Sequence, residues 1–351
     1  MAAKYTRREF LKLVGLGLGS LAFRPFFGGE EPANSGDLAR IAIKSVSVYS
    51  QPWDKSKILY QRYRDDLVNV YYEVVSEHGP GYNPLWYRVW GGYIHSAYLQ
   101  RVKISLNPVA SGVLEKGQLA EVTVPFTQTQ QFKSKALGWK NVYRLYQDSV
   151  HWVVGIEQGT DGRPWYRIKD ELFDADKLDY FAPAEHFRLI PAEELAPISP
   201  EVPPGKKKVE VSISQQTLTA FENGNIVLKT KISTGVPMAT PPPGQPSTDT
   251  PTGEFHVQNK MPSKHMGDGN LTDDLEAYEL PGVPWVCFFE PEHGVATHGT
   301  FWHTNYGMTM SHGCVNMRPE EAKWLYRWMT PVASDPTKWD NKGYGTVIEV
   351  A

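Results

Sequence analysis

The sequence is poor in cysteine, with only Cys287 and Cys314 among its 351 residues. At most one disulfide can form, which excludes the disulfide frameworks of small secreted domains. Cys287 lies in the apolar run 284–289, where we expect a small, inert, buried thiol. Cys314 has His, Gly, Ser and Asn neighbours, which no core strand needs, so it is the thiol with a candidate chemical role.

Basic residues are not in excess either. Lys and Arg number 36 against 39 Asp and Glu, which gives a net charge of −3. The basic triplet 206–208 is interpreted as the solvated end of a linker. Because nucleic-acid-binding domains carry a basic face or stripe, the sequence predicts no nucleic-acid partner.

The apolar run at 13–23 is too short for a comfortable membrane span and contains three glycines. A basic segment with Arg7, Arg8 and Lys12 precedes it, and a basic start before a short apolar run is typical of an export signal. The paired arginines followed by Phe-Leu-Lys resemble the twin-arginine signal, which implies the twin-arginine export machinery as a partner. We therefore expect a signal and tether at 1–33 and a location in the cell envelope, beyond the cytoplasmic membrane. A buried N-terminal helix is the alternative.

The front half of the chain has the pattern of small β structures. Short alternating runs at 45–49, 67–71 and 86–90 are separated by turn-rich segments, which indicates a small β-barrel. We assign this barrel to residues 41–104, which resemble the bacterial SH3-like domains of cell-wall enzymes.

A second β module is expected at 106–195. The element Trp-Tyr-Arg-aliphatic at 86–89 recurs at 165–168, each time after a turn containing Gly and Pro. Such a recurrence indicates two related modules. Coincidence between two Trp-rich segments is the alternative.

A Pro-rich stretch at 196–206 marks the main domain boundary and is predicted to be a linker. The domain after it, 207–350, opens with an alternating strand at 209–213 and has a hairpin signal at Asn223-Gly224. A single clear helix is expected at 319–329, because Pro and two Glu residues suit its first turn. The chain as a whole is therefore predicted to be mainly β.

The candidate chemistry lies between residues 298 and 318. The stretch begins with His298-Gly299 and continues to Ser311-His312-Gly313-Cys314-Val315-Asn316, with Arg318 two positions further on. It resembles the L,D-transpeptidase family (the YkuD-like catalytic domain), whose signature is a His-Gly followed further along by Ser-His-Gly-Cys-aliphatic-Asn/Arg. The resemblance covers about 207–350 and implies a β-sandwich.

A thiol is a good nucleophile only as its thiolate, so Cys314 needs a proton acceptor. His298 can accept that proton at neutral pH if the two strands of the motif lie side by side. Gly313 lets the backbone turn closely, so that its N–H and that of Cys314 can face a developing oxyanion. The resemblance further implies that the carbonyl of Gly299 orients the His298 ring.

The remaining polar residues of the motif have supporting roles with structural alternatives. His312 is expected to shape the pocket or to assist proton movement. Asn316 and Arg318 are expected to fix the loop or to hold a substrate carboxylate, for which Arg offers a bidentate fork. Ser311 is as well explained as a turn or cap residue.

Two other readings of the same residues stay open. A zinc site can be drawn from the cluster His293, His298, His303, His312 and Cys314, although its spacing fits neither a strand nor a helix and no HExxH or paired CxxC occurs. Otherwise His293 and His303 are expected on the surface or in loops. A non-catalytic wall-binding protein is the second alternative, and it leaves Ser-His-Gly-Cys unexplained.

The resemblance implies a definite reaction without a metal or organic cofactor. The donor is a peptidoglycan tetrapeptide stem, and Cys314 attacks the carbonyl of its third residue and expels the terminal D-alanine. A side-chain amine of a second stem then takes the acyl group to form a 3→3 cross-link. Water as acceptor would make an L,D-carboxypeptidase, and a protein amine would make a wall-anchoring enzyme.

The polar, Gly-containing segment between residues 258 and 284 precedes the motif. A segment of this length is expected either to close over the site as a lid or to be a passive surface loop.

Overall fold

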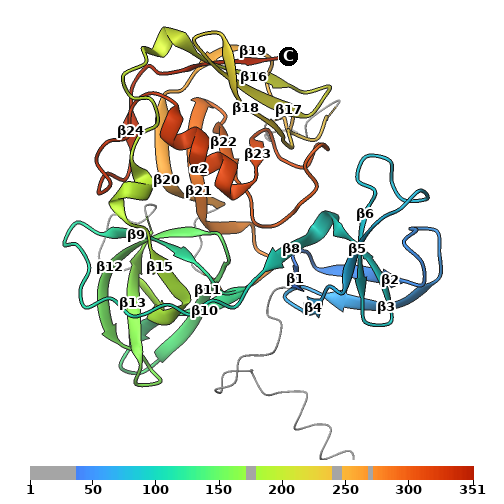
Figure 1. The fold of residues 1–351 in the computed structure, drawn as a ribbon. Coiled ribbons are helices and arrows are strands. Elements are labelled where there is room, and N and C mark those ends of the chain that lie inside the picture. The colour runs from blue at the N-terminus through green and yellow to red at the C-terminus, as the bar shows by residue number, and fades with distance from the viewer. Residues whose placement is uncertain (1–36, 171–178, 239–246, 268–271) are drawn as a thin grey trace, which may run out of the picture. The chain divides into compact units, whose positions relative to one another are not determined.

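The computed structural model describes residues 37–170, 179–238, 247–267 and 272–351. The predicted signal and tether at 1–33 lie outside these ranges. Among the described residues, no helix is both long and apolar enough to cross a membrane. Strands dominate the described part, as the alternating sequence pattern predicted (Figure 1).

The first module is built of two antiparallel sheets with one small core. A five-stranded sheet in the order β3-β2-β7-β6-β5 contains β2 (Ser45–Tyr49), β3 (Ile58–Tyr63), β5 (Tyr72–Val75), β6 (Leu85–Val89) and β7 (Gly92–His95). A three-stranded sheet in the order β4-β1-β8 contains β1 (Leu38–Ile41), β4 (Leu67–Asn69) and β8 (Leu99–Val102). The strands predicted at 45–49 and 86–90 are thereby confirmed as β2 and β6.

The second module is a single seven-stranded antiparallel sheet with its own core. Its order is β11-β10-β14-β13-β12-β9-β15, and its strands are β9 (Gln118–Val122), β10 (Phe126–Ser134), β11 (Gly138–Tyr146), β12 (Val150–Gln158), β13 (Pro164–Lys169), β14 (Tyr180–Pro183) and β15 (Phe187–Leu189). The recurring Trp-Tyr-Arg element lies on β6 in the first module and on β13 in the second. The assignment of either module as SH3-like stays a prediction.

The C-terminal domain places two five-stranded sheets and one helix around a large core, with a smaller apolar cluster beside it. One sheet has the order β18-β17-β16-β25-β19, from β16 (Lys207–Ser212), β17 (Thr217–Glu222), β18 (Asn225–Lys231), β19 (Gly253–His256) and β25 (Val347–Val350). The other has the order β23-β22-β21-β20-β24, from β20 (Asn259–Gly267), β21 (Glu279–Glu290), β22 (Val295–Gly299), β23 (Val315–Met317) and β24 (Asn341–Lys342). The predicted β-sandwich with one helix is thus what the structure shows.

Local signals explain the turn and the helix of this domain. Asn223 and Gly224 join β17 to β18 with φ values of 51° and 81°, the left-handed conformation that an Asn-Gly hairpin adopts. Helix α2 (Pro319–Trp328) begins at the predicted proline and packs on β21 and β22. Leu325 and Trp328 of this helix are buried, so its apolar face belongs to the core.

The segment 258–284 differs from the expectation. Strands β20 and β21 pair antiparallel from Asn259 opposite Phe288 to Gly267 opposite Glu279. Most of the segment is therefore a long hairpin in the sheet that contains β20 and β21, so the prediction of a lid or passive loop is wrong for the paired residues. Residues 268–271, between the two strands, lie outside the described part.

Two buried lysines hold the end of α2. One of them is Lys207, so the prediction that the triplet 206–208 is the solvated end of a linker is wrong for this residue. Lys207 Nζ donates to the carbonyl oxygen of Trp328 at 2.8 Å, and Lys260 Nζ donates to those of Met329 and Pro331 at 2.5 and 2.9 Å. Burial lowers the pKa of Lys260 to about 8. Each ammonium satisfies carbonyls that the helix end leaves without partners, and so ties α2 to a strand of each sheet.

We expect Lys260→Met to destabilise the catalytic domain, because the substitution leaves the Met329 and Pro331 carbonyls unpaired in the core. Each unpaired buried acceptor costs about 1–3 kcal/mol, so the thermal unfolding transition should fall by several degrees. The matched control is Lys229→Met on exposed strand β18, which should shift the transition little. Equal melting temperatures for the two variants, measured by calorimetry, would contradict this role.

Candidate active site

The site begins with the parallel pairing of β22 and β23. Thr297 lies opposite Val315, and His298 lies opposite Asn316. Continuing this register by one residue places Cys314 beside Ala296. Residues two apart on a strand point to the same face, so Cys314 and His298 lie on one side of the strand pair. The side-by-side strands required by the sequence argument are therefore present.

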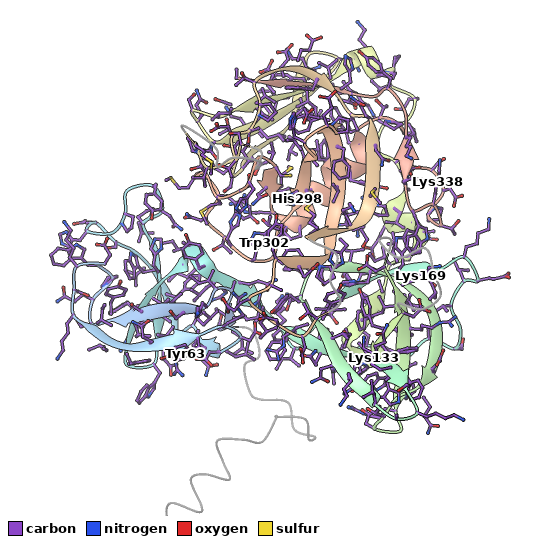
Figure 2. The ribbon with its side chains drawn as sticks, turned by 180° about the vertical axis from the view of Figure 1, so that it is seen from behind. Tyr63, Lys133, Lys169, His298, Trp302 and Lys338 are labelled. Atoms are coloured by element: carbon purple, nitrogen blue, oxygen red, sulfur yellow. The ribbon has the colours of Figure 1, made fainter. Side chains whose placement is uncertain are left out.

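His298 is buried, and its ring is fixed by its own strand. The Nδ1 atom lies 3.0 Å from the carbonyl oxygen of Gly299. A carbonyl can only accept, so Nδ1 carries the proton and Nε2 keeps a lone pair. Burial lowers the pKa of His298 to about 4, so the ring is neutral at neutral pH. Trp302 lies beside it, with ring centres 5.9 Å apart (Figure 2).

Cys314 is partly accessible, whereas Cys287 on β21 is fully buried. The Cys314 thiol donates to the carbonyl oxygen of Gly294, with Sγ 3.6 Å from that oxygen. Burial raises the pKa of Cys314 to about 11 and that of Cys287 to about 12. The resting pair is therefore a neutral thiol and a neutral imidazole.

The segment before the cysteine is bound by a distant part of the domain. Thr234 O accepts the N–H groups of Met310 and Ser311, and Val236 N–H donates to Ser311 O. Thr250 Oγ1 accepts from Gly235 N–H at 2.8 Å and donates to Gly313 O at 2.7 Å. The segment 234–236 and Thr250 thus support the loop that leads to Cys314.

Close packing explains one glycine here. A Cβ atom on Gly235 would lie 1.9 Å from Thr248 O and 3.0 Å from Gly313 N, which leaves no room for a side chain.

Ser311, His312 and Gly313 form the turn before Cys314. Gly313 has a φ of 117°, which favours glycine, and its N–H donates to Ser311 Oγ at 3.2 Å. Ser311 Oγ in turn donates to the Cys314 carbonyl. The Gly313 N–H, expected at an oxyanion, is thus engaged with Ser311 in this state. His312 is exposed and faces Tyr278, with ring centres 6.0 Å apart.

Arg318 is occupied by structural contacts. It donates to Thr230 Oγ1 at 3.2 Å and to Glu321 Oε2 at 3.3 Å, and it lies over the Tyr306 ring. These contacts tie β18 to the start of α2. They favour the loop-fixing alternative for Arg318 over the binding of a substrate carboxylate.

His303 was expected on the surface or in a loop, and the surface prediction is wrong. Its side chain is buried, and burial together with nearby His298 lowers its pKa to about 3. Its Nδ1 accepts the Asn305 N–H at 3.2 Å, and its Nε2 lies 2.9 Å from the side-chain amide of Asn316. In the sequence, the only sign of a role for His303 was its position between His298 and Cys314. Its burial could not be predicted, because neighbouring residues do not reveal which loop side chains become buried.

The zinc alternative receives no support from this arrangement. Within the described ranges, the three possible ligand groups that come within 4.8 Å of one another belong to Glu290, Glu292 and His293. His293 is exposed and bonded to Glu290, and it is the only one of the five zinc candidates in that group.

A neutral resting pair predicts the pH dependence of thiol reactivity. Below the thiol pKa the thiolate fraction rises tenfold per pH unit, so alkylation of Cys314 by iodoacetamide should climb by about that factor per unit from pH 7 to 10. Peptide mass spectrometry separates Cys314 from Cys287, whose burial should leave it unlabelled in the folded protein. A rate that levels off near neutral pH would instead indicate a resting thiolate–imidazolium pair.

Comparisons with known proteins agree with this geometry. The family model of the YkuD L,D-transpeptidase catalytic domain matches residues 206–350. L,D-transpeptidase 1 of Mycobacterium tuberculosis is 31% identical over 132 residues, which cover 34% of this chain and 45% of that relative. The chain thus spans about half the length of the curated relatives it matches.

Solved structures with similar parts include two bacterial L,D-transpeptidases. The NMR structure of the catalytic domain of the E. faecium enzyme is 28% identical and covers 41% of this chain and 96% of that chain, with a TM-score of 0.29. The crystal structure of the Xylanimonas cellulosilytica enzyme is 23% identical. The match covers 41% of this chain and 60% of that chain, with a TM-score of 0.30. The family model confirms the resemblance of residues 206–350, and the sequence relative agrees with it. Residues 206–350 of this chain match the model of the L,D-transpeptidase catalytic domain family.

Proposed function

We propose that the protein is an exported L,D-transpeptidase that cross-links peptidoglycan through Cys314. The observation that carries the proposal is the placement of Cys314 and His298 on one face of the β22–β23 pair, with a neutral imidazole whose Nε2 can accept a proton. This is the arrangement that nucleophilic catalysis by a protonated thiol requires. The proposed partners are peptidoglycan stem peptides, as donor and acceptor.

Acylation follows from these groups. Cys314 Sγ attacks the carbonyl carbon of the third residue of a tetrapeptide stem, while its proton passes to His298 Nε2. The backbone N–H groups of Gly313 and Cys314 are proposed to bind the oxyanion, for which Gly313 must exchange Ser311 Oγ for the new partner. The imidazolium then protonates the amine of the departing D-alanine, the C–N bond breaks, and a thioester remains.

Transfer reverses the roles. An amine of a second stem attacks the thioester, His298 accepts the amine proton, and the C–S bond breaks as the amide forms. The sulfur leaves as a thiolate and takes the proton from His298, which restores the neutral pair. The product is the 3→3 cross-link.

The environment of the thiol favours this order of events. Cys314 packs against an apolar cluster of Val283, Val286 and Ala296 that also contacts Met266, Leu280 and Trp302. Apolar surroundings disfavour a separated thiolate and imidazolium, and they strengthen hydrogen bonds once a substrate excludes water. Exposed His312 lies at the rim of the site, where it is proposed to shape the pocket rather than to act as the first proton acceptor.

Water or a protein amine would serve as acceptor in the same chemistry, giving an L,D-carboxypeptidase or a wall-anchoring enzyme. A non-catalytic wall-binding protein remains the alternative from another class. The fate of the acyl group distinguishes the carboxypeptidase and the wall-anchoring enzyme from a cross-linking enzyme. The absence of any thioester would favour the non-catalytic wall-binding protein.

Export and wall binding complete the proposal. The twin-arginine pattern supports transport across the cytoplasmic membrane and a location in the cell envelope. Exposed aromatic side chains support wall binding by the first module, where Tyr60, Tyr71 and Trp90 line a shallow groove. Tyr71 is 56% exposed and Trp90 is 70% exposed, and such rings offer apolar contact area to a polymer at low entropic cost.

The central test is a mass measurement on the protein incubated with disaccharide-tetrapeptide. The protein should gain the mass of the donor minus D-alanine on the tryptic peptide that contains Cys314, because a thioester separates acylation from transfer. Cys314→Ala should form no adduct while keeping the fold, and Cys287→Ala should retain activity. His298→Ala should slow adduct formation by roughly 10²–10⁴-fold, and His312→Ala should slow it less.

The products of the same incubation name the reaction. A dimer with a 3→3 bond means transpeptidase, a tripeptide means carboxypeptidase, and a protein adduct means anchoring. Full turnover by Cys314→Ala would show that Cys314 is not the nucleophile. Impairment of the His312 variant alone would show that the base is wrongly assigned.

Wall binding is tested with the full chain. Trp90→Ala and Tyr71→Ala should reduce pelleting with insoluble sacculi, because each removes exposed aromatic surface from the groove. Neither variant should change acylation by soluble donor. The matched control is Tyr344→Ala in the catalytic domain, where the ring is 77% exposed. Wild-type pelleting by both groove variants would refute the targeting role.

A further inference from the structure

The loop between His298 and the cysteine motif is bonded to the first β module. Thr304 N–H donates to Ala97 O at 2.9 Å, and Thr304 Oγ1 donates to Ser96 O at 2.9 Å. Beside them, Asn83 Nδ2 donates to Asn305 Oδ1 at 3.0 Å. Two neighbouring residues of the catalytic loop therefore depend on partners outside residues 206–350.

A second contact fixes the same loop a few residues earlier. Arg40 on β1 is buried and donates to the carbonyl oxygen of Phe301 at 3.2 Å. Its guanidinium also pairs with Asp65 at 2.9 Å, so its charge is compensated within the first module. Since the module holds the loop at both Phe301 and Thr304, the intervening Trp302 and His303 lie between two anchored points.

From Asn305 the contacts continue to the catalytic strand. Its backbone N–H donates to His303 Nδ1 at 3.2 Å, and His303 Nε2 lies 2.9 Å from the amide nitrogen Nδ2 of Asn316. Asn316 lies opposite His298 and two residues after Cys314. His303 is 2%, Asn305 4% and Asn316 1% exposed, so water cannot replace a lost partner in this chain of contacts.

We propose that the first β module positions the active site, and that Asn83 acts as a positioning residue through Asn305, His303 and Asn316. The inference rests on the proposed acyl transfer by Cys314. It gives the module a role beyond wall binding, because the loop that sets His303 against the catalytic strand is complete only when the module supplies Asn83, Ser96 and Ala97.

The physical reason is the precision that proton transfer requires. Without Asn83, the buried Oδ1 of Asn305 loses its hydrogen-bond donor and the loop can rotate, which moves His303 and Asn316 of β23 relative to His298. A misplacement of about 1 Å at reacting groups lowers a rate by about 10²-fold. Substrate binding elsewhere in the site need not change.

The test uses the full chain with Asn83→Ala and the matched control Glu77→Ala, an exposed residue of the same segment. Single-turnover acylation by disaccharide-tetrapeptide is followed by mass spectrometry at several donor concentrations. We expect the acylation rate constant of Asn83→Ala to fall by about 10- to 100-fold. The donor concentration for half-maximal rate, sacculus pelleting and the melting temperature should match the control. Wild-type acylation by Asn83→Ala overturns the proposal.

A double variant separates positioning from general weakening. If Asn83 acts through His303, adding Asn83→Ala to His303→Ala should slow acylation no further, whereas independent effects would multiply. Multiplying effects overturn the proposal. Should Asn83→Ala lower the melting temperature, Thr304→Val removes a single hydroxyl from the same contact and must show the same selective loss of rate constant. Absence of an adduct on the wild-type protein counts against the proposed function itself, and so is distinguishable from failure of this inference.

Discussion

The parallel pairing of β22 with β23 is the constraint on which the site depends. Parallel neighbours need a connection that leaves the sheet and returns, and here that connection is the loop from Thr300 to Cys314. The pairing alone brings a histidine and a cysteine sixteen positions apart in the sequence onto one face of the strand pair. The loop must then be held by something other than the sheet, which explains why so many of its polar groups are bonded to the 233–236 segment and to the first module.

Burial sets the charge states of both groups in the proposed proton transfer, Cys314 and His298. It raises the pKa of the Cys314 thiol and lowers that of the His298 imidazole, so both groups rest uncharged. In the proposed mechanism, the thiolate therefore forms only as the substrate is attacked. Cys287 shows what burial does without a function: it has a similar pKa shift but no access to solvent.

Buried polar contacts cross the boundaries between the modules. Arg40 joins β1 to Phe301 of the catalytic loop, and Ser263 Oγ on β20 donates to Val150 O of the second module. His265 on β20 lies 2.6 Å from Asp170 of the second module and 2.6 Å from Glu279 on β21. Such groups are costly to expose singly, so the front modules are structural neighbours of the catalytic sheet as well as candidate wall-binding units.

The sequence by itself determined what local chemistry controls. Alternation predicted β2 and β6, Asn223-Gly224 predicted the β17–β18 hairpin, and Pro319 marked the start of α2, because each depends on residues close in the chain. The motif identified Cys314 and His298 for the same reason. Only the tertiary structure decided the burial of His303, the engagement of Gly313 N–H by Ser311, and the pairing that turned 258–284 into a hairpin. It also joined Asn83 to Asn305 across 222 positions, a contact that depends on how separate β structures pack and that no local pattern encodes.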